Sequence, residues 1–219
     1  AEAEASLARL RRWKDDRRLI LRVDRTDLSK NVLRGFLAYE RFLVGHPEWR
    51  GRVAFLALLN PSRQDLPEYR TYLEDCVGVV ERINQAFGQE GWQPIELSIE
   101  DDLFRAVAAY GLYDVLLVNP VFDGMNLVAK EGPALNRHDG VLVLSENAGS
   151  YAELGRDALG INPFDVGSTA EALAHALEME AEERARRARG LKASIRRNRL
   201  EDWVGRQVRD LERAAADRR

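Results

Sequence analysis

The sequence lacks the features of secreted and membrane proteins. Its single cysteine, Cys76, cannot form an internal disulfide and lies among valines in a helical pattern. We interpret it as a small buried hydrophobic residue in a protein of the reducing cytoplasm. The first ten residues have no apolar core of a signal peptide, and no run approaches the about 18 apolar residues that a membrane span needs. We therefore expect a cytoplasmic protein that has no membrane partner.

The fingerprints of common nucleotide and metal sites are also absent. No G-x-G-x-x-G follows the first apolar run, and the sequence contains no P-loop. His46, His138 and His175 lie in surroundings typical of surface or core histidines. No Ser/His/Asp order, Cys/His cluster or carboxylate-rich metal loop stands out. We expect no cofactor and no metal, and the sequence offers no set of catalytic residues for hydrolysis.

Positive charge is concentrated near the end of the chain. The net charge is only −3, but residues 181–219 hold 13 Lys and Arg against 7 Asp and Glu. These arginines alternate with Ala, Glu and Leu at helical spacing, and no nucleic-acid motif accompanies them. The pattern favours a solvated helix face or a docking surface over a nucleic-acid site.

Apolar runs and amphipathic stretches alternate along most of the chain. Runs rich in Val, Ile and Leu predict strands at residues 18–23, 53–59, 94–97, 115–118, 141–144 and 159–161. Helical patterns lie at residues 31–44, 67–87, 101–110, 127–135, 150–154 and 169–177. This alternation predicts an α/β fold with a doubly wound parallel sheet in residues 1–180. Residues 181–219 then form a tail of two helices, with Trp203 and Val204 as apolar anchors.

The segment after the first predicted strand holds two cations near the expected ligand-binding edge of the sheet. Ligands of such sheets bind beyond the carboxyl ends of the strands. Arg25 and Lys30 flank a tight loop there, and a guanidinium fork with a mobile ammonium suits a diphosphate. The alternative is that both are surface charges paired with Asp24 and Asp27.

A second segment of this kind follows the strand at residues 115–118. Gly124 permits close backbone approach, and the free amides that open the next helix bind phosphate or sugar oxygens. Asp123 can accept hydrogen bonds from sugar hydroxyls, and Glu131 could hold a ribose diol. The alternative is a helix capped by Asp123, with Met125 and Leu127 in the core.

The run Asp-Gly-Met-Asn-Leu-Val-Ala-Lys-Glu at residues 123–131 resembles the signature of the trehalose-6-phosphate synthase family. These are retaining, metal-independent glycosyltransferases of the B-type architecture, which has two Rossmann-like domains. Further matches are Arg25 with Lys30, Pro61-Ser62-Arg63 with Tyr69, residues 144–149 and Asn162-Pro163-Phe164-Asp165. Their order and spacing resemble the Rossmann-like C-terminal domain of that family.

The resemblance implies a role for each matching residue. Arg25, Lys30 and Asp123 would be catalytic. Arg25 and Lys30 would bind the donor diphosphate, and Asp123 would hold the transferred sugar. The backbone amides of Gly124, Met125 and Asn126 would also hold that sugar, those of Leu127 and Val128 would contact phosphate, and Glu131 would bind the ribose. The nucleotide base would lie near the backbone of Ser98 and Ile99, and Arg63 would reach the acceptor phosphate.

The implied reaction transfers glucose from a GDP- or UDP-linked donor to glucose 6-phosphate. Two departures qualify it, because Asn31 replaces the usual glycine and Asn147 a common aromatic residue. One alternative is a pseudo-glycosyltransferase that joins a nucleotide-linked cyclitol to an amino-cyclitol phosphate, and glucosylglycerol-phosphate synthases are also similar. The other is a nucleotide-sugar-binding module without catalysis.

The resemblance begins after residue 14 and covers the donor-binding domain only. It implies that an N-terminal acceptor domain, in a companion chain or a longer one, completes the enzyme. The two tail helices would dock on that domain, and the chain would be inactive without it. The protein could also form a homo-oligomer.

Overall fold

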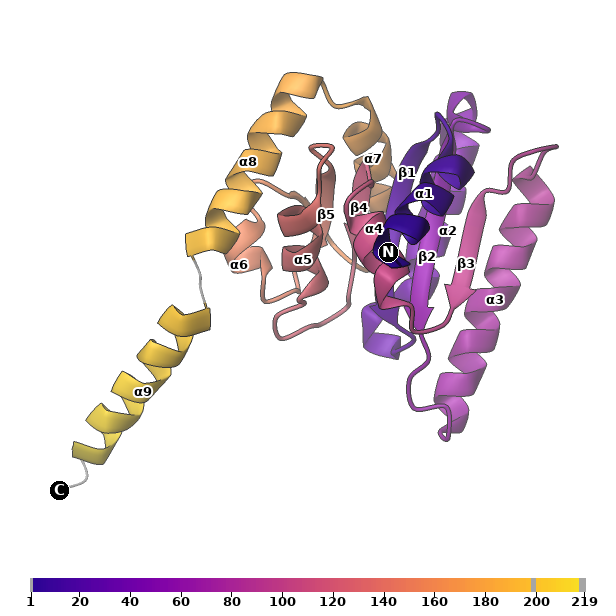
Figure 1. The fold of residues 1–219 in the computed structure, drawn as a ribbon. Helices are drawn as coiled ribbons and strands as arrows, with labels where there is room; N and C mark the ends of the chain where they lie inside the picture. Colours follow the sequence, from indigo (N-terminus) through magenta and orange to yellow (C-terminus); the bar gives the residue numbers. More distant parts are fainter. Residues whose placement is uncertain (1, 198–199, 217–219) are drawn as a thin grey trace.

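The computed structural model describes residues 2–197 and 200–216, which are built around one parallel β-sheet (Figure 1). Its strands are β1 (Arg18–Arg25), β2 (Val53–Asn60), β3 (Ile95–Ile99), β4 (Val115–Val118), β5 (Val141–Ser145) and β6 (Leu159–Ile161). They lie in the order β3-β2-β1-β4-β5-β6, and every neighbouring pair is parallel. The predicted doubly wound sheet is confirmed.

Helices cover both faces of this sheet. One face carries α2 (Val32–Gly45), α3 (Pro67–Phe87) and α7 (Val166–Glu178); the other carries α1 (Glu2–Lys14), α4 (Leu103–Tyr110), α5 (Val128–Leu135), α6 (Tyr151–Leu154) and α8 (Ala181–Arg197). Successive residues of a strand point to opposite faces of the sheet. Ile20 packs against the layer that contains α2, α3 and α7, whereas Leu19 and Leu21 pack against the opposite layer of helices. Because both faces are covered, the strands are continuously apolar.

The strand order reverses between β1 and β4, and this reversal positions the site. Ile20 pairs with Val115 and Leu21 with Leu116, although the two strands are far apart in sequence. α2 follows β1 onto one face, whereas α5 follows β4 onto the other. Connections that diverge in this way leave a crevice between the carboxyl ends of the two strands. Both predicted ligand-binding segments begin at that crevice.

Helix α1 was not predicted from the sequence. It packs on α4, where Leu10 is 4% exposed and Leu7 and Trp13 are partly buried. These three large apolar residues at a spacing of three form only a narrow stripe, and the other residues of the segment are charged, Ala or Ser. The helix exists because α4 offers an apolar surface for that stripe, and tertiary packing outweighs the weak local pattern.

The two tail helices differ in their surroundings. α8 packs on α5 and α6: Leu191 is fully buried, and the Lys192 ammonium donates to the Asn136 carbonyl at 2.9 Å. α9 (Leu200–Ala216) extends away from the sheet, with Trp203 and Val204 about half exposed (Figure 1). Docking of the tail on another domain stays a prediction, and α9 is the part that presents apolar side chains for it. In the described ranges, no helix is long and apolar enough to cross a bilayer.

Candidate functional site

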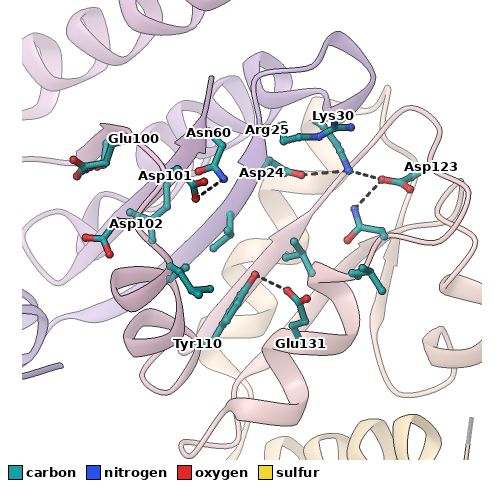
Figure 2. A pocket seen from close by; sticks show the side chains of 18 of the residues that line it. Asp24, Arg25, Lys30, Asn60, Glu100, Asp101, Asp102, Tyr110, Asp123 and Glu131 are labelled. Atoms are coloured by element: carbon teal, nitrogen blue, oxygen red, sulfur yellow. Dashed lines mark hydrogen bonds and ion pairs between the residues drawn. The ribbon is translucent and has the colours of Figure 1, made fainter. Parts of the chain in front are cut away.

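A cleft of about 690 Å³ opens at the carboxyl ends of the strands (Figure 2). Its walls are the ends of β1, β2 and β3, the loop that leads into α4, the start of α5 and the segment between β4 and α5. This is the edge at which the sequence predicts ligand binding. Of the residues with predicted donor or catalytic roles, all but Gly124 and Ile99 are among the described lining residues.

Lys30 and Arg25 both line this cleft, but they are held differently. Lys30 ends the 3₁₀ turn η1 (Leu28–Lys30); its ammonium lies 2.6 Å from Asp123 Oδ2 and 3.8 Å from Asp24 Oδ1. Arg25 ends β1 and lies 2.6 Å from Asp27 Oδ2, with its side chain 59% exposed. The alternative pairings with Asp24 and Asp27 therefore exist. Lys30 is nevertheless no surface charge, because its side chain is only 15% exposed.

Asp123 is the carboxylate at which the two predicted segments meet. Besides the Lys30 ammonium, it accepts hydrogen bonds from the Met125 amide at 3.3 Å and from the Asn126 side chain at 3.2 Å. Burial raises the pKa of Asp123, but the hydrogen bond and charge of Lys30 outweigh it and hold that pKa below its usual value. Asp123 is therefore ionised at neutral pH and suited to accept hydrogen bonds from hydroxyl groups.

The turn that follows Asp123 leaves space for a ligand. A Cβ on Gly124 would meet no described heavy atom within 4 Å, so packing within the chain does not require glycine there. Asn126 adopts a left-handed conformation, with φ 68°, and its side chain accepts a hydrogen bond from the Ala129 amide at 3.1 Å. Capping of α5 by Asp123 is therefore wrong. A core role is wrong for Met125 and Leu127, which are 45% and 60% exposed.

The far end of the cleft lies beside α4 (Figure 2). Glu131 accepts a long hydrogen bond, 3.4 Å, from the hydroxyl of Tyr110, whose pKa is raised by burial and by that carboxylate. Ser98 also lines the cleft, whereas Ile99, which is 37% exposed, is not among the described lining residues. Tyr110 was missed by the sequence analysis, because its place at the end of an amphipathic helix is equally typical of a core residue.

Arg63 lies apart from the described cleft lining. It follows β2 in a left-handed conformation, with φ 47°, and donates to the Tyr69 hydroxyl at 3.1 Å. The hydroxyl of Ser62 donates to Asp27 Oδ1 at 2.7 Å, which ties this segment to the loop after β1. The acceptor-phosphate role of Arg63 stays a prediction.

Asn31, one of the two departures from the family pattern, has a conformation that explains the usual glycine. Its φ of 59° is left-handed, where only Gly, Asn and Asp are readily accommodated. The side chain is buried, and its amide donates to the carbonyls of Asn119 at 3.0 Å and Pro163 at 2.8 Å. Asn31 thus connects the loop that carries Lys30 to the segments after β4 and β6. Asn147, the second departure, donates to the Val121 carbonyl at 2.9 Å.

Asn31 offers a matched pair of substitutions. Asn31→Gly keeps the left-handed conformation but removes both hydrogen bonds, whereas Asn31→Ala removes the bonds and adds strain of about 1 kcal/mol. In urea titrations both variants should unfold at lower denaturant than the original chain, and Asn31→Ala should lose about 1 kcal/mol more than Asn31→Gly. Equal stability of the two variants would contradict the importance of the backbone conformation.

One group of potential metal ligands occurs among the described residues. Atoms of His46, Glu48 and Glu178 lie within 4.8 Å of one another, and both glutamates are exposed. His46 and Glu48 lie between the end of α2 and the start of β2, at the amino ends of the strands. The group is therefore separate from the cleft at the carboxyl ends.

Known proteins resemble this chain along nearly its whole length. The model of Glycosyltransferase family 20 matches residues 2–213. A bifunctional trehalose-6-phosphate synthase/phosphatase of Thermoproteus tenax is 43% identical over 204 residues, which cover 90% of this chain and 27% of that protein.

Solved structures show the same similarity. The α,α-trehalose-phosphate synthase (UDP-forming) of Burkholderia xenovorans in complex with glucose-6-phosphate is 36% identical, with a TM-score of 0.91, over 96% of this chain and 48% of that one. The trehalose-6-phosphate enzyme of E. coli bound with UDP-2-fluoro glucose is 36% identical, with a TM-score of 0.89, over 94% and 46%. The chain thus spans less than half the length of each of these proteins.

Proposed function

The chain belongs to glycosyltransferase family 20, and from that membership we propose that it is the donor-binding half of a trehalose-6-phosphate synthase. The complete enzyme would transfer glucose from a nucleotide sugar to glucose 6-phosphate, with retention at the sugar carbon. One observation carries the proposal: the Lys30 ammonium and the Asp123 carboxylate lie 2.6 Å apart in a cleft at the strand reversal. The signature at residues 123–131 and the loop after β1, which carries Lys30, thus meet at one site.

The cleft has a suitable group for each part of a nucleotide sugar. Asp123 would accept hydrogen bonds from the transferred sugar, because its lowered pKa keeps it ionised. The diphosphate would lie between Lys30 and the exposed side chain of Arg25, with the amides of Leu127 and Val128 at the start of α5 beside it. Glu131 would hold the ribose diol. The base would extend toward Ser98.

The chemistry follows from this arrangement. As the bond between sugar and diphosphate breaks, negative charge develops on the leaving nucleoside diphosphate. Lys30 and Arg25 would stabilise that charge in the place that a metal ion takes in other transferases, so the proposal includes no metal and no cofactor. Retention requires the acceptor hydroxyl to attack from the face that the leaving group occupied. The acceptor, whose phosphate Arg63 would contact, would therefore approach from the diphosphate side of the sugar.

We base the proposed substrates and the proposed acceptor half on the relatives. Structures of two relatives hold glucose-6-phosphate and UDP-2-fluoro glucose, which supports glucose as the transferred sugar and glucose 6-phosphate as the acceptor. The chain spans less than half of each relative, which supports the proposal that an acceptor half outside these residues completes the enzyme. A cytoplasmic location fits the buried thiol of Cys76, the only cysteine.

Calorimetry of the chain with UDP-glucose and GDP-glucose tests the donor site without the acceptor half. We expect saturable binding of one donor, and at least tenfold weaker binding after Lys30→Ala, because a hydrogen bond between charged groups is lost. Lys130→Ala is the matched control. That lysine is buried to a similar extent, with a side chain 17% exposed, but it pairs with Glu153 at 2.8 Å instead of facing the cleft. Equal losses in the two variants, or no binding of either donor, would contradict the proposed site.

A further inference from the structure

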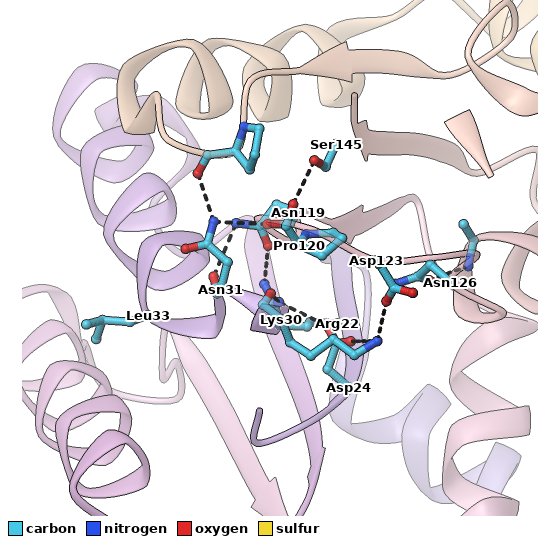
Figure 3. A network of polar contacts seen from close by, with 12 residues as sticks. Arg22, Asp24, Lys30, Asn31, Leu33, Asn119, Pro120, Asp123, Asn126 and Ser145 are labelled. Carbon is cyan, nitrogen blue, oxygen red and sulfur yellow. Dashed lines mark hydrogen bonds and ion pairs between the residues drawn. The ribbon is translucent and has the colours of Figure 1, made fainter. Parts of the chain in front are cut away.

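Arg22 lies fully buried on β1, in a polar network with Asp24 and Lys30, which line the cleft (Figure 3). Its guanidinium lies 2.9 Å from Asp24 Oδ2, and it donates to the backbone carbonyl of Lys30 at 2.5 Å. It also donates to the side-chain oxygen of Asn119 at 2.5 Å. From the sequence alone this arginine has no expected role, because it falls inside a predicted strand.

Burying an arginine is costly unless its charge is paired and its N–H groups are hydrogen-bonded. Nη1 and Nη2 of Arg22 have such partners, whereas its buried Nε has none among the described residues. The fold makes specific room for this one, since a Cβ on Gly35 of α2 would lie 2.5 Å from Arg22 Nη1. Asn119 is also arranged for it: while its oxygen accepts from Arg22, its amide donates to the Asn31 carbonyl at 3.3 Å. Arg22, Asn119 and Asn31 together fix the peptide that follows Lys30 in one position.

The charges between Arg22 and the cleft alternate in sign. Arg22 contacts one oxygen of Asp24, the other oxygen of Asp24 lies 3.8 Å from the Lys30 ammonium, and that ammonium lies 2.6 Å from Asp123. The pKa of Asp24 is raised overall, because its burial outweighs the positive charges of Arg22 and Lys30, which favour its ionised form. The carboxylate form of Asp24 therefore depends on contact with these cations. While Arg22 neutralises Asp24, Lys30 can remain with Asp123 at the cleft. Without Arg22, Lys30 is the remaining cation among the described residues that contacts Asp24, and a buried carboxylate would attract it strongly.

We propose that Arg22 is a positioning residue that holds Lys30 at the cleft. It acts on both ends of that lysine, binding its carbonyl directly and preventing Asp24 from capturing its ammonium. The consequence for a diphosphate rests on the proposed function, but the placement of Lys30 does not. Arg22 thereby sets how much positive charge a donor meets at Lys30.

A double-mutant cycle between Arg22→Met and Lys30→Ala separates positioning from a general structural role. By calorimetry with the nucleotide sugar that the chain binds, Arg22→Met alone should weaken affinity about tenfold, because it displaces a charged hydrogen-bond partner of the diphosphate. In the Lys30→Ala background, Arg22→Met should change affinity less than twofold. Additive losses would overturn the proposal, because a residue that merely stabilises the fold affects binding whether or not Lys30 is present.

Crystal structures of the unliganded variants test the same proposal without any nucleotide sugar. In Arg22→Met, the Lys30 ammonium should lie within hydrogen-bonding distance of Asp24 and no longer of Asp123; an unchanged position would overturn the proposal. If that variant fails to fold, Arg22→Met/Asp24→Asn removes the unpaired buried charge as well. There Lys30 should remain with Asp123, and its departure would contradict capture by Asp24. Absence of donor binding to the original chain would refute the proposed function, and these structures would still decide the role of Arg22.

Discussion

Lys30→Ala should lower kcat by about 10²-fold or more in the enzyme assembled with its acceptor half. The ammonium lies in a largely buried position at the cleft, where the side chain is 15% exposed. At about 4 Å and an effective dielectric constant near 20, its attraction to one unit of developing charge is roughly 4 kcal/mol before desolvation is subtracted. About 2.7 kcal/mol of lost transition-state stabilisation corresponds to 10²-fold in rate.

The proposed role predicts which kinetic constant changes. Negative charge on the leaving diphosphate grows as the bond breaks, so Lys30→Ala should lower kcat. It should lower kcat/KM further, because donor binding is weakened as well. Lys130→Ala should leave both constants within about twofold, because its partner Glu153 lies outside the described cleft lining. An unchanged kcat with a raised KM in Lys30→Ala would show that Lys30 contributes ground-state binding only.

The architecture was predictable because strands buried on both faces have a clear sequence pattern. All six apolar runs are strands, with differences of at most two residues at their ends; for example, the run predicted at residues 94–97 is β3 at Ile95–Ile99. Helix α7 begins at Val166, three residues before the predicted start, because the Asp165 side chain caps it by accepting from the Ser168 amide. A cap of this kind adds no apolar residue, so hydrophobic periodicity does not reveal it.

Proximity of Lys30 and Asp123 could be anticipated from the sequence, but the support beneath them could not. Both follow strands whose carboxyl ends lie at one edge of a parallel sheet, so the fold class alone brings them together. Arg22 is different, because a charged residue within a strand is normally taken to face solvent at an edge. Its burial depends on Gly35 of a helix and Asn119 of a distant loop, and no local pattern encodes that contact. The side-chain bonds of Asn31 are equally non-local.

The loop that carries Asp123 depends on a second loop, which follows β5. The Gly149 amide donates to the Asp123 carbonyl at 2.9 Å, and the Ser150 amide donates to the Met125 carbonyl at 2.9 Å. A Cβ on Gly149 would lie 2.0 Å from the Gly124 carbonyl oxygen and 2.8 Å from its carbonyl carbon. Both of these are backbone atoms, which cannot move aside as the end of a flexible side chain can. Any side chain at Gly149 must therefore displace the turn at Gly124.

Gly149→Ala should lower the free energy of unfolding by about 3 kcal/mol through this overlap. It should also lower the activity of the assembled enzyme by about 10²-fold, because a shift of about 1 Å in a positioning group has an effect of that size. Urea titration and steady-state kinetics measure the two quantities. Gly78→Ala is the stability control, since a Cβ at that position on α3 would meet no described atom within 4 Å.

Gly124→Ala tests the side of the same turn that faces the proposed ligand. Its Cβ would also meet no described atom, so the free energy of unfolding should stay within about 0.5 kcal/mol of the original value. If the transferred sugar lies against this turn, the added methyl group must collide with it, and donor affinity should fall at least tenfold. If only Gly149→Ala loses stability while both variants lose donor binding, the loop after β5 supports one side of the turn and the transferred sugar occupies the other side. Unchanged binding in Gly124→Ala would instead place the sugar elsewhere in the cleft.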